Sequence, residues 1–345
     1  MTIEPGLRAA LADPALFSRA FWPRAAMRPY QAALARAVAA AVVGRDPAPF
    51  AAAFSRQAGK DETLVQLIAY LMVRMSQRGG NIVVAAPTLT PQATITRDRL
   101  IQRLRQNPLT AGRARLQDGY IVRAGNVAAR FLSAAPGANA RGQTADLLLV
   151  ANEAQDIDPG RWDSVFAPMT ASTNATTLYL GTVWDRNGLL HRQMEHARLL
   201  AAQDARQRLF LAPWRTVAAD VPAYAAHVRD RIAQLGPDHP FVKTEYELVA
   251  LDAEAGLFPP ERQAQLRGDH PRQRTPTPGK LYALLIDVAG EEESAIAGEY
   301  DPAAKRDATA LTVVEVTPTR DRPAYKVVDR RAWTGKKHSE LLPQL

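Results

Sequence analysis

The stretch "SRQAGK" at residues 55–60 contains the residue types that bind phosphate groups, and a stretch of helical period follows it. Phosphate binding needs backbone N–H groups that converge at a helix N-terminus and a lysine that reaches the terminal phosphates. In the G-x-x-x-x-G-K-[ST] pattern, Gly59 and Lys60 occupy the second glycine and the lysine. Phe54 replaces the first glycine, and Asp61 replaces the hydroxyl residue. The stretch therefore predicts a variant phosphate-binding loop.

A carboxylate that could activate water lies near the end of the apolar stretch "ADLLLVANEAQ" at residues 145–155. ATP hydrolysis needs a carboxylate that orients the attacking water, and Glu153 is placed for this role if the stretch is a buried strand. Taken alone, Glu153 could equally be a charged residue that ends a strand at the surface. Its combination with Lys60 on an earlier strand and helix favours an ATPase.

These side chains need a sheet that brings them to one edge. The chain alternates short apolar stretches with stretches of helical period, which is typical of a parallel sheet with helices on both faces. Ligands collect at the carboxyl ends of such strands, where polar residues of this sequence stand. We predict strands at 48–55, 81–87, 145–155 and 175–182, and helices at 28–44, 62–80, 91–106 and 188–203.

The pattern changes in the last third of the chain. Helical stretches lead to a polar, proline-rich stretch that is typical of a linker. Three strand-like stretches with short connections then predict an antiparallel meander. The predicted helices are 222–236 and 241–256, the linker is 268–280, and the strands are 281–290, 308–316 and 324–333.

Composition limits the classes of site and partner. The 345 residues include no cysteine, which excludes disulfides and cysteine-based metal sites, and the scattered histidines argue against zinc. A net charge of +8 favours a polyanionic partner, although the arginine excess could equally reflect genome composition. No apolar stretch approaches the roughly 20 residues that span a bilayer, and the N-terminus lacks a signal pattern. We therefore expect a location in the cytoplasm.

In chain order, these motifs resemble those of the large subunit of tailed-phage terminases, in which a P-loop ATPase is fused to an RNase H-like nuclease. The resemblance covers nearly the whole chain. It rests on "MRPYQ" (27–31), "SRQAGK" (55–60), "NEAQD" (152–156), "LYLGTVWD" (178–185), "IDVAG" (286–290) and "RDATALTVVEV" (306–316). It implies a helical lead-in at 1–27, a P-loop ATPase domain at 28–214, a helical connector and proline-rich linker at 215–280, and a partial RNase H-like domain at 281–345.

The resemblance also implies roles for single residues. Lys60, Arg56 and Glu153 would be catalytic, and Arg56 would stabilise charge on the phosphates. Gly181 and Thr182 would couple the state of the nucleotide to movement. Gln31 would contact the adenine. The implied ATP-binding residues are Tyr30, Gln31, Ser55, Arg56, Gln57, Gly59, Lys60, Asp61, Glu62 and Thr63.

Two departures from the resembled family concern the Mg²⁺ that accompanies ATP. Asp61 follows the lysine in place of a hydroxyl residue, and Asn152 stands in the acidic box in place of an aspartate. Magnesium accepts carboxylates, amide carbonyls and waters. Our hypothesis is an exchange, in which Asp61 and Asn152 both bind the metal: Asp61 supplies the carboxylate charge that Asn152 lacks, and Asn152 supplies a neutral oxygen ligand. Thr63 is a second candidate for a hydroxyl contact. The alternative is a decayed site, or one that only holds nucleotide.

The C-terminal segment carries a candidate nuclease site. Asp287 ends a predicted buried strand, where the resembled family has its first metal-binding carboxylate, and Asp307 begins the next strand. Two Mg²⁺ or Mn²⁺ ions would be held there if further carboxylates completed the site. Asp307 could equally be a turn residue before a strand. Because the resemblance places the other carboxylates beyond Leu345, we expect an incomplete sheet and no nuclease activity in this chain.

The reading that combines these features is an ATP-driven subunit of a viral DNA-packaging motor. The resemblance implies double-stranded DNA, a terminase small subunit and a portal protein as partners, a ring when assembled, and the cytoplasm of the host cell. One alternative is a helicase-like, DNA-dependent ATPase. Another is an inactive nucleic-acid-binding remnant of a prophage.

Overall fold

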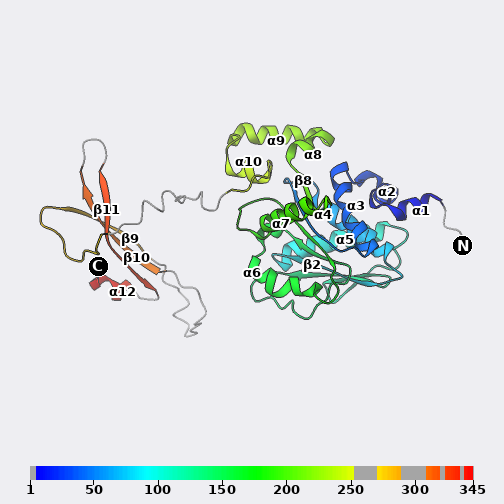
Figure 1. Ribbon diagram of the computed structural model, residues 1–345, viewed down its shortest axis with the longest axis horizontal. Helices are drawn as coiled ribbons and strands as arrows, with labels where there is room; N and C mark the ends of the chain where they lie inside the picture. The colour runs from blue at the N-terminus through cyan, green and yellow to red at the C-terminus, as the bar shows by residue number, and fades with distance from the viewer. Residues whose placement is uncertain (1–4, 252–269, 289–307, 319–322, 335–337, 345) are drawn as a thin grey trace. The chain divides into compact units, whose positions relative to one another are not determined.

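The computed structural model describes residues 5–251, 270–288, 308–318, 323–334 and 338–344 (Figure 1). The chain divides into two compact units, Met1–Pro259 and Pro260–Leu345, and each is described by itself. The predicted division into four segments is finer than these two units and stays a prediction.

The first unit alternates helices and strands, as the hydrophobic pattern indicates. Its helices are α1 (Pro5–Ala12), α2 (Pro14–Phe21), α3 (Pro29–Gly44), α4 (Lys60–Arg74), α5 (Thr94–Gln106), α6 (Pro159–Arg161), α7 (Leu189–Asp204), α8 (Trp214–Asp220), α9 (Pro222–Leu235) and α10 (Pro240–Glu245). Its strands are β1 (Pro49–Phe54), β2 (Gly80–Ala86), β3 (Arg115–Gln117), β4 (Ile121–Ala124), β5 (Val127–Ser133), β6 (Leu148–Asn152), β7 (Thr176–Gly181) and β8 (Leu209–Ala212).

The strands form one eight-stranded sheet in the order β3-β4-β5-β2-β6-β7-β1-β8. The pairs from β5 through β2, β6, β7 and β1 to β8 are all parallel. At one end of the sheet, β4 pairs in antiparallel fashion with both β3 and β5. This mostly parallel sheet confirms the predicted α/β class.

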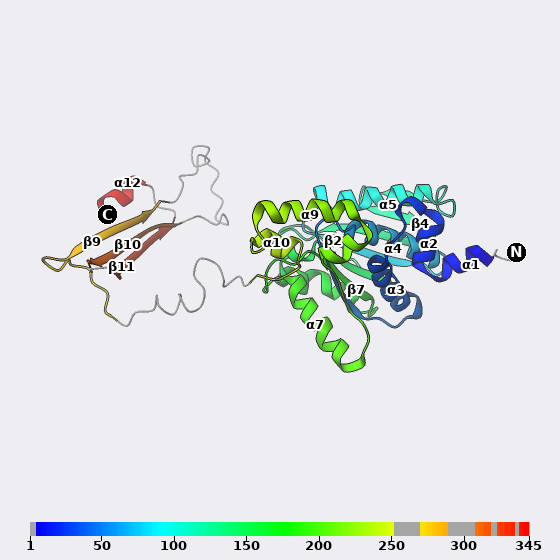
Figure 2. The same cartoon turned by 90° about the horizontal axis from the view of Figure 1, so that it is seen from above.

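Alternate residues of the central strands point into two separate cores, because side chains along a strand face opposite sides of the sheet. Phe50, Phe54 and Val84 lie in the core beneath α2, α3, α4 and α5. Ala51 and Tyr179 lie in the other core, which includes α7 and the short helical turns after β6. Figure 2 shows the helices against the sheet. The predicted helices on both faces are therefore present.

Several boundaries differ from the predicted ones. Helix α4 ends at Arg74, before the predicted end at residue 80. A turn then leads to Gly79 and Gly80, both of which have positive φ. Helix α10 covers only Pro240–Glu245 of the predicted helix at 241–256, while 246–251 is not helical and 252–256 lies outside the described residues. The strands between residues 115 and 133 and strand β8 were not predicted.

The second unit has a three-stranded antiparallel sheet, in the order β11-β10-β9, and a short helix. This order confirms the predicted meander. Its elements are β9 (Leu281–Asp287), β10 (Ala308–Thr317), β11 (Ala324–Thr334) and α12 (His338–Leu341). The segment predicted as a linker contacts this sheet, because the Gln273 N–H donates to the Val328 carbonyl and Arg272 pairs with Asp329.

Strand β9 corrects one expectation from the sequence, which was that it is buried. Leu281, Leu284 and Leu285 are each more than half exposed, at 60%, 57% and 58%. Among the described residues, the strand pairs only with β10, so it forms an edge of this sheet. Apolar composition predicted the strand correctly but not the number of its neighbours.

Candidate nucleotide-binding site

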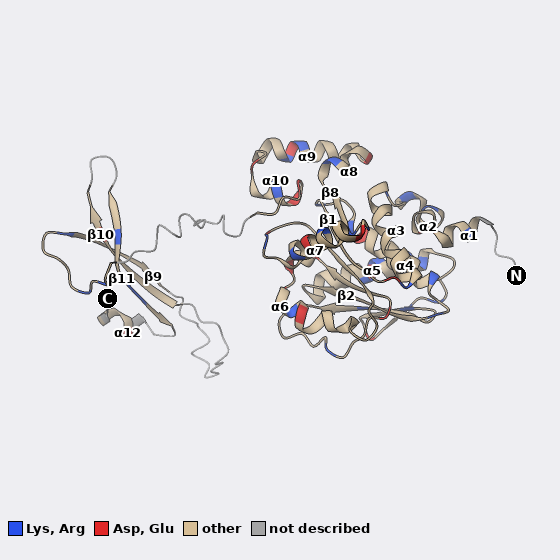
Figure 3. Ribbon diagram, viewed as in Figure 1, with Lys and Arg blue, Asp and Glu red and all other residues tan. Residues whose placement is uncertain are grey.

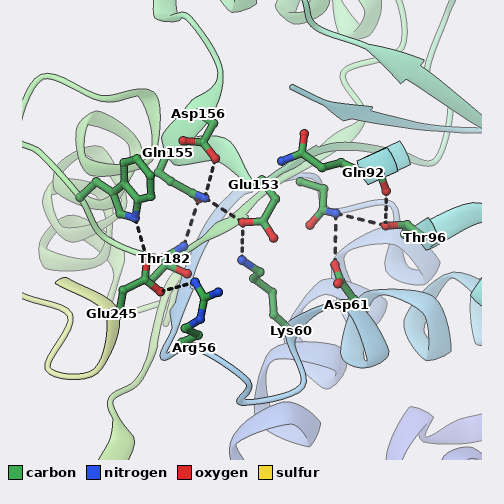
Figure 4. Close-up of polar contacts among 12 residues, drawn as sticks. Arg56, Lys60, Asp61, Gln92, Thr96, Glu153, Gln155, Asp156, Thr182 and Glu245 are labelled. Carbon is green, nitrogen blue, oxygen red and sulfur yellow. Dashed lines mark hydrogen bonds and ion pairs between the residues drawn. The ribbon is translucent and has the colours of Figure 1, made fainter. Parts of the chain in front are cut away.

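The carboxyl ends of β1, β6 and β7 meet at one edge of the sheet, and the predicted site residues follow these strands. Strand β7 lies between β1 and β6, with Ala53 opposite Gly181 and Leu180 opposite Asn152. A cavity of about 370 Å³ opens at this edge (Figure 4). It is lined by Ser55, Arg56, Gln57, Gly59, Lys60, Asp61, Glu62, Arg99, Glu153, Gln155, Asp156, Thr182, Trp184 and Glu245.

The loop between β1 and α4 is fixed from the start of α3. The Tyr30 hydroxyl donates to the Ala58 carbonyl at 2.7 Å, and Gln31 Nε2 lies 3.2 Å from the carbonyl oxygens of Ala58 and Gly59. Gly59 has a φ of +82°, and a Cβ at this position would lie 2.5 Å from Gln31 Nε2. Gly59 is thus needed both for its backbone conformation and for space.

Gln31 is engaged at both ends of its amide. Its Oε1 accepts the Arg28 backbone N–H at 2.9 Å, while its Nε2 contacts the loop carbonyls. In this arrangement Gln31 caps α3 and positions the loop, and the adenine contact implied by the resemblance stays a prediction.

Lys60 and Glu153 face each other across the cavity. The Lys60 Nζ and Glu153 Oε2 atoms are 2.5 Å apart, and the two side chains are 13% and 22% exposed. Glu153 has a left-handed backbone conformation, with a φ of +53°, directly after β6. Non-glycine residues in this region are uncommon and occur often at functional sites. The sheet therefore brings together the two residues on which the sequence argument rests.

Gln155 connects Glu153 to the end of β7, and the sequence argument did not single it out. Its Nε2 donates to Glu153 Oε2 at 2.8 Å, and its Oε1 accepts the Thr182 backbone N–H at 3.1 Å. Gly181 leaves room for this amide, because a Cβ there would lie 2.2 Å from Gln155 Oε1. The predicted coupling residues thus contact the predicted catalytic carboxylate through one side chain.

Asp156 adds a second carboxyl group beside Glu153. Gln155 Nε2 also donates to Asp156 Oδ2, at 3.1 Å. Burial and, after it, the charge of Glu153 raise the pKa of Asp156 above its ordinary value. The sequence offered a signal for both residues, since they stand in the same acidic motif as Glu153.

Asp61 and Asn152, the two departures from the usual pattern, are in contact. Asn152 Nδ2 lies 3.3 Å from Asp61 Oδ1 and 3.3 Å from Thr96 Oγ1. The other oxygen of Asp61 forms an ion pair with Arg99, whose Nη1 is 3.1 Å away. Asp61 lines the cavity, whereas Asn152 is 1% exposed and lies behind it. Asn152 Oδ1 has no hydrogen-bond partner among the described residues.

Glu62 and Thr63 make contacts that belong to the helices. Glu62 Oε1 accepts from Arg103 Nε at 2.7 Å and from Gln66 Nε2 at 2.6 Å. The Thr63 hydroxyl donates to the Gly59 carbonyl at 2.9 Å, and Thr63 is 1% exposed. Both residues thus fix the first turns of α4, and their predicted contacts with ATP or metal remain predictions.

Helices α9 and α10 contribute residues that the sequence argument missed. Glu245, which is 5% exposed, accepts from Trp184 Nε1 at 3.0 Å and pairs with Arg56 at 3.5 Å. The Tyr224 hydroxyl donates to the Arg56 carbonyl at 2.8 Å and lies 3.0 Å from Ser55 Oγ. Burial raises the pKa of Tyr224 to about 12, so this hydroxyl stays protonated. No spacing in the sequence links Glu245 to a loop so far from it along the chain.

Of the two candidate nuclease residues, the structure describes only Asp287. Asp287 is exposed at the end of β9, opposite Ala310. Asp307 lies outside the described residues. Within the described part of the chain, no group of three or more His, Cys, Asp or Glu side chains could hold a metal ion.

Comparison with known proteins identifies a class of fold. No protein-family model and no curated protein sequence matches this chain. The crystal structure of the HK97 bacteriophage large terminase is similar, with a TM-score of 0.55 and 16% identity over 99% of this chain and 70% of that one. This likeness confirms, at the level of the fold, the predicted resemblance to terminase large subunits.

Two further structures are similar at lower scores. An ATPase domain mutant of the Thermus phage P74-26 large terminase has a TM-score of 0.46 and 18% identity, over 61% of this chain and 97% of that one. The large terminase of a thermophilic bacteriophage, in complex with ADP, has a TM-score of 0.47 and 10% identity, over 92% and 73%. Because these two TM-scores are below 0.5, neither structure carries an argument for the fold.

Among the described residues, no helix has the length and apolar character needed to cross a membrane.

Proposed function

We propose that this chain is the ATP-hydrolysing subunit of a motor that packages phage DNA. The observation that carries the proposal is the cavity at the sheet edge, where Lys60, Glu153, Gln155 and Thr182 meet beside a phosphate-loop geometry. The HK97 likeness supports the same reading, since that protein is a bacteriophage large terminase. At 16% identity, it contributes the fold and not the activity.

Lys60 and Glu153 would exchange their mutual contact for contacts with the substrate. The Lys60 ammonium would move to the terminal phosphates, where a cation stabilises the charge of the transferring group. Glu153 would then be free to accept a hydrogen bond from the attacking water and orient it. Arg56, half exposed at the mouth of the cavity, would add a second cation to the phosphates.

The residues fit a Mg²⁺ ion that the nucleotide brings with it. Proteins commonly bind Mg²⁺ through one or two carboxylates together with substrate phosphates. Asp61 provides one carboxylate on the cavity wall, and the orphaned Oδ1 of buried Asn152 lies on the neighbouring side chain. When bound, the ion would neutralise charge on the phosphates. Asp61 is thus the proposed ligand, and Asn152 the residue that positions it.

Gln155 would pass the state of the site to β7. A change in the position of Glu153 changes the hydrogen bond from Gln155, and Gln155 holds the Thr182 backbone. Movement of this segment is the proposed first step by which hydrolysis drives DNA.

The remaining features are proposed from the net charge and the fold. Double-stranded DNA is the proposed polyanion, because the chain carries a net charge of +8. Arginines stand on the helices of the first unit, one on α2, four on α5 and two on α9 (Figure 3). A small subunit and a portal protein as partners, a ring on assembly, and the host cytoplasm as location complete the proposal. Nuclease activity from the second unit is not part of it.

The test is ATP hydrolysis by the full chain with and without double-stranded DNA. We expect hydrolysis that DNA stimulates, and a loss of about 10²–10⁴-fold in Glu153→Gln, which keeps the shape but loses the charge. Lys60→Ala should lose nucleotide binding as well. Asp163→Asn, an exposed residue paired with Arg192, serves as the control and should hydrolyse ATP normally. An ATPase rate that Glu153→Gln leaves unchanged would overturn the proposal. ATP hydrolysis that single-stranded DNA stimulates, together with separation of the strands of duplex DNA, would favour the helicase-like alternative.

A further inference from the structure

Two arginines of α5 reach the first turn of α4, and they do so differently. Arg103 pairs with Glu62, with its Nε 2.7 Å from Glu62 Oε1. Arg99, one turn earlier on α5, pairs with Asp61, with its Nη1 3.1 Å from Asp61 Oδ2. Arg99 lines the nucleotide cavity, whereas Arg103 does not. Helix α5 thus supplies one arginine that lines the cavity, Arg99, and one that does not, Arg103.

The negative charge of Asp61 would repel the phosphates of a bound nucleotide, which a neutral hydroxyl residue would not do. Its carboxylate is 28% exposed and shares the cavity with the loop that would hold the phosphates. Like charges at such short range repel each other, and the repulsion grows where solvent screens them poorly. Nucleotide without a metal ion would therefore meet an unfavourable negative charge at Asp61 unless another cation lay beside it.

The contacts of Asp61 show where that cation lies. Asn152 donates to one carboxylate oxygen from a neutral amide, and this contact adds no charge. Arg99 holds the other oxygen and brings a full positive charge, since a guanidinium stays protonated in proteins. The Arg99 side chain is 47% exposed, so it can leave this position without a large packing cost.

We propose that Arg99 is the resident counter-ion of Asp61, and that it occupies the place of the divalent cation until a metal–nucleotide complex displaces it. This inference rests on the proposed function of the cavity. It makes nucleotide binding less dependent on Mg²⁺ than Asp61 alone would allow. It also gives Arg99 a role through Asp61, as a positioning residue and not as a direct phosphate ligand.

The experiment measures the dissociation constant of a fluorescent ATP analogue, with EDTA and with Mg²⁺, by anisotropy. In Arg99→Gln, we expect metal-free binding to weaken about tenfold, the size of effect that about 1.4 kcal/mol produces. Nucleotide binding with Mg²⁺ should be unchanged or tighter, because the Mg²⁺ ion no longer competes with the Arg99 guanidinium for Asp61. The dissociation constant in EDTA divided by that in Mg²⁺ therefore rises in this variant. Arg99→Lys, which keeps the charge, should restore most of the metal-free affinity.

Two controls separate this role from a structural one. Arg103→Gln removes the neighbouring ion pair between the same helices and should leave the ratio unchanged. In an Asp61→Asn background, Arg99→Gln should no longer change metal-free binding, because the charge that Arg99 balances is gone. Equal weakening under both conditions, or an undiminished effect in the Asp61→Asn background, would overturn the inference. If the unaltered chain binds no nucleotide even with Mg²⁺, the proposed function itself fails.

Discussion

Glu153 and Asp287 look alike in the sequence and differ in the structure. Glu153 follows an apolar strand and Asp287 ends one, and each is a candidate for chemistry on that ground. Strand β6, before Glu153, is buried along its whole length and pairs with both β2 and β7. Strand β9, which ends in Asp287, is largely exposed, and its one pairing partner in the described part of the chain is β10.

The difference teaches that neighbours, and not the apolar strand itself, assemble a site. Strands β1, β6 and β7 end at the same edge, so Lys60, which follows β1, meets Glu153 there, and Gln155 joins Glu153 to Thr182 at the end of β7. An edge strand receives neighbours from one side only. Within the described residues, Asp287 is joined by no cluster of metal-binding side chains.

We expect the largest effect from a substitution that places a second negative charge in the buried region behind Asp61. Asn152→Asp would bring a second carboxylate to about the position of an amide that now lies 3.3 Å from Asp61. We expect a loss of about 3 kcal/mol in the free energy of unfolding, the scale for an uncompensated buried charge. Denaturant unfolding of the full chain measures it.

The same pair also tests the exchange hypothesis for Mg²⁺. Adding Asp61→Ser to Asn152→Asp removes the like charge, so the double variant should be more stable than Asn152→Asp alone. It should also recover ATPase activity that Asp61→Ser loses. Effects that simply add would show that the two residues act independently and would end the exchange hypothesis.

A smaller test concerns the loop itself. Gly59 and Gly142 both have a φ of +82°, but a Cβ at Gly142 would have no atom within 4 Å. Gly142→Ala should therefore cost only the backbone strain, about 1 kcal/mol. Gly59→Ala should cost about 1 kcal/mol more, since the new Cβ must displace Gln31, and it should weaken nucleotide binding.

Thermal unfolding and nucleotide titration of both variants provide the measurements. Equal losses of stability in the two variants would mean that the contact between Gln31 and the loop is not a constraint.

The smallest expected effect is in the second unit. Asp287 is exposed at a sheet edge, so Asp287→Ala should change stability by no more than about 0.5 kcal/mol. ATP hydrolysis should be unchanged. A plasmid-cutting assay with Mg²⁺ or Mn²⁺ is the sharpest measurement. Cutting by the unaltered chain that this variant abolishes would show that the comparison between the two acids is wrong.

Sequence alone predicted the parts of the fold that hydrophobic pattern controls. The parallel strands ending near Phe54, Asn152 and Gly181 are short apolar runs followed by polar residues, which is typical of buried strands. The order of the strands, with β7 between β1 and β6, could not be predicted, because it depends on packing between residues distant in sequence. The short, polar strand β3 gave no pattern, since all its residues are exposed.

The candidate site divides in the same way. Lys60, Glu153 and Thr182 stand in motifs with local spacing, so the sequence reveals them. Arg99 and Glu245 reach the cavity only because α5 and α10 fold against it. Charged residues on a helix are ordinary in a sequence, and tertiary contacts alone distinguish these two.

Gly181 has a consequence for how this protein can vary. A Cβ at position 181 would meet Gln155 Oε1 at 2.2 Å and Leu190 Cδ2 at 2.9 Å. A larger residue at 181 would therefore push the Gln155 amide away from the Thr182 backbone, and a shorter residue at 155 cannot span from Glu153 to Thr182. In a library of variants selected for activity, these two positions should be linked, with glycine at one whenever glutamine is kept at the other. The absence of a side chain at position 181 thus constrains which residue can stand at position 155.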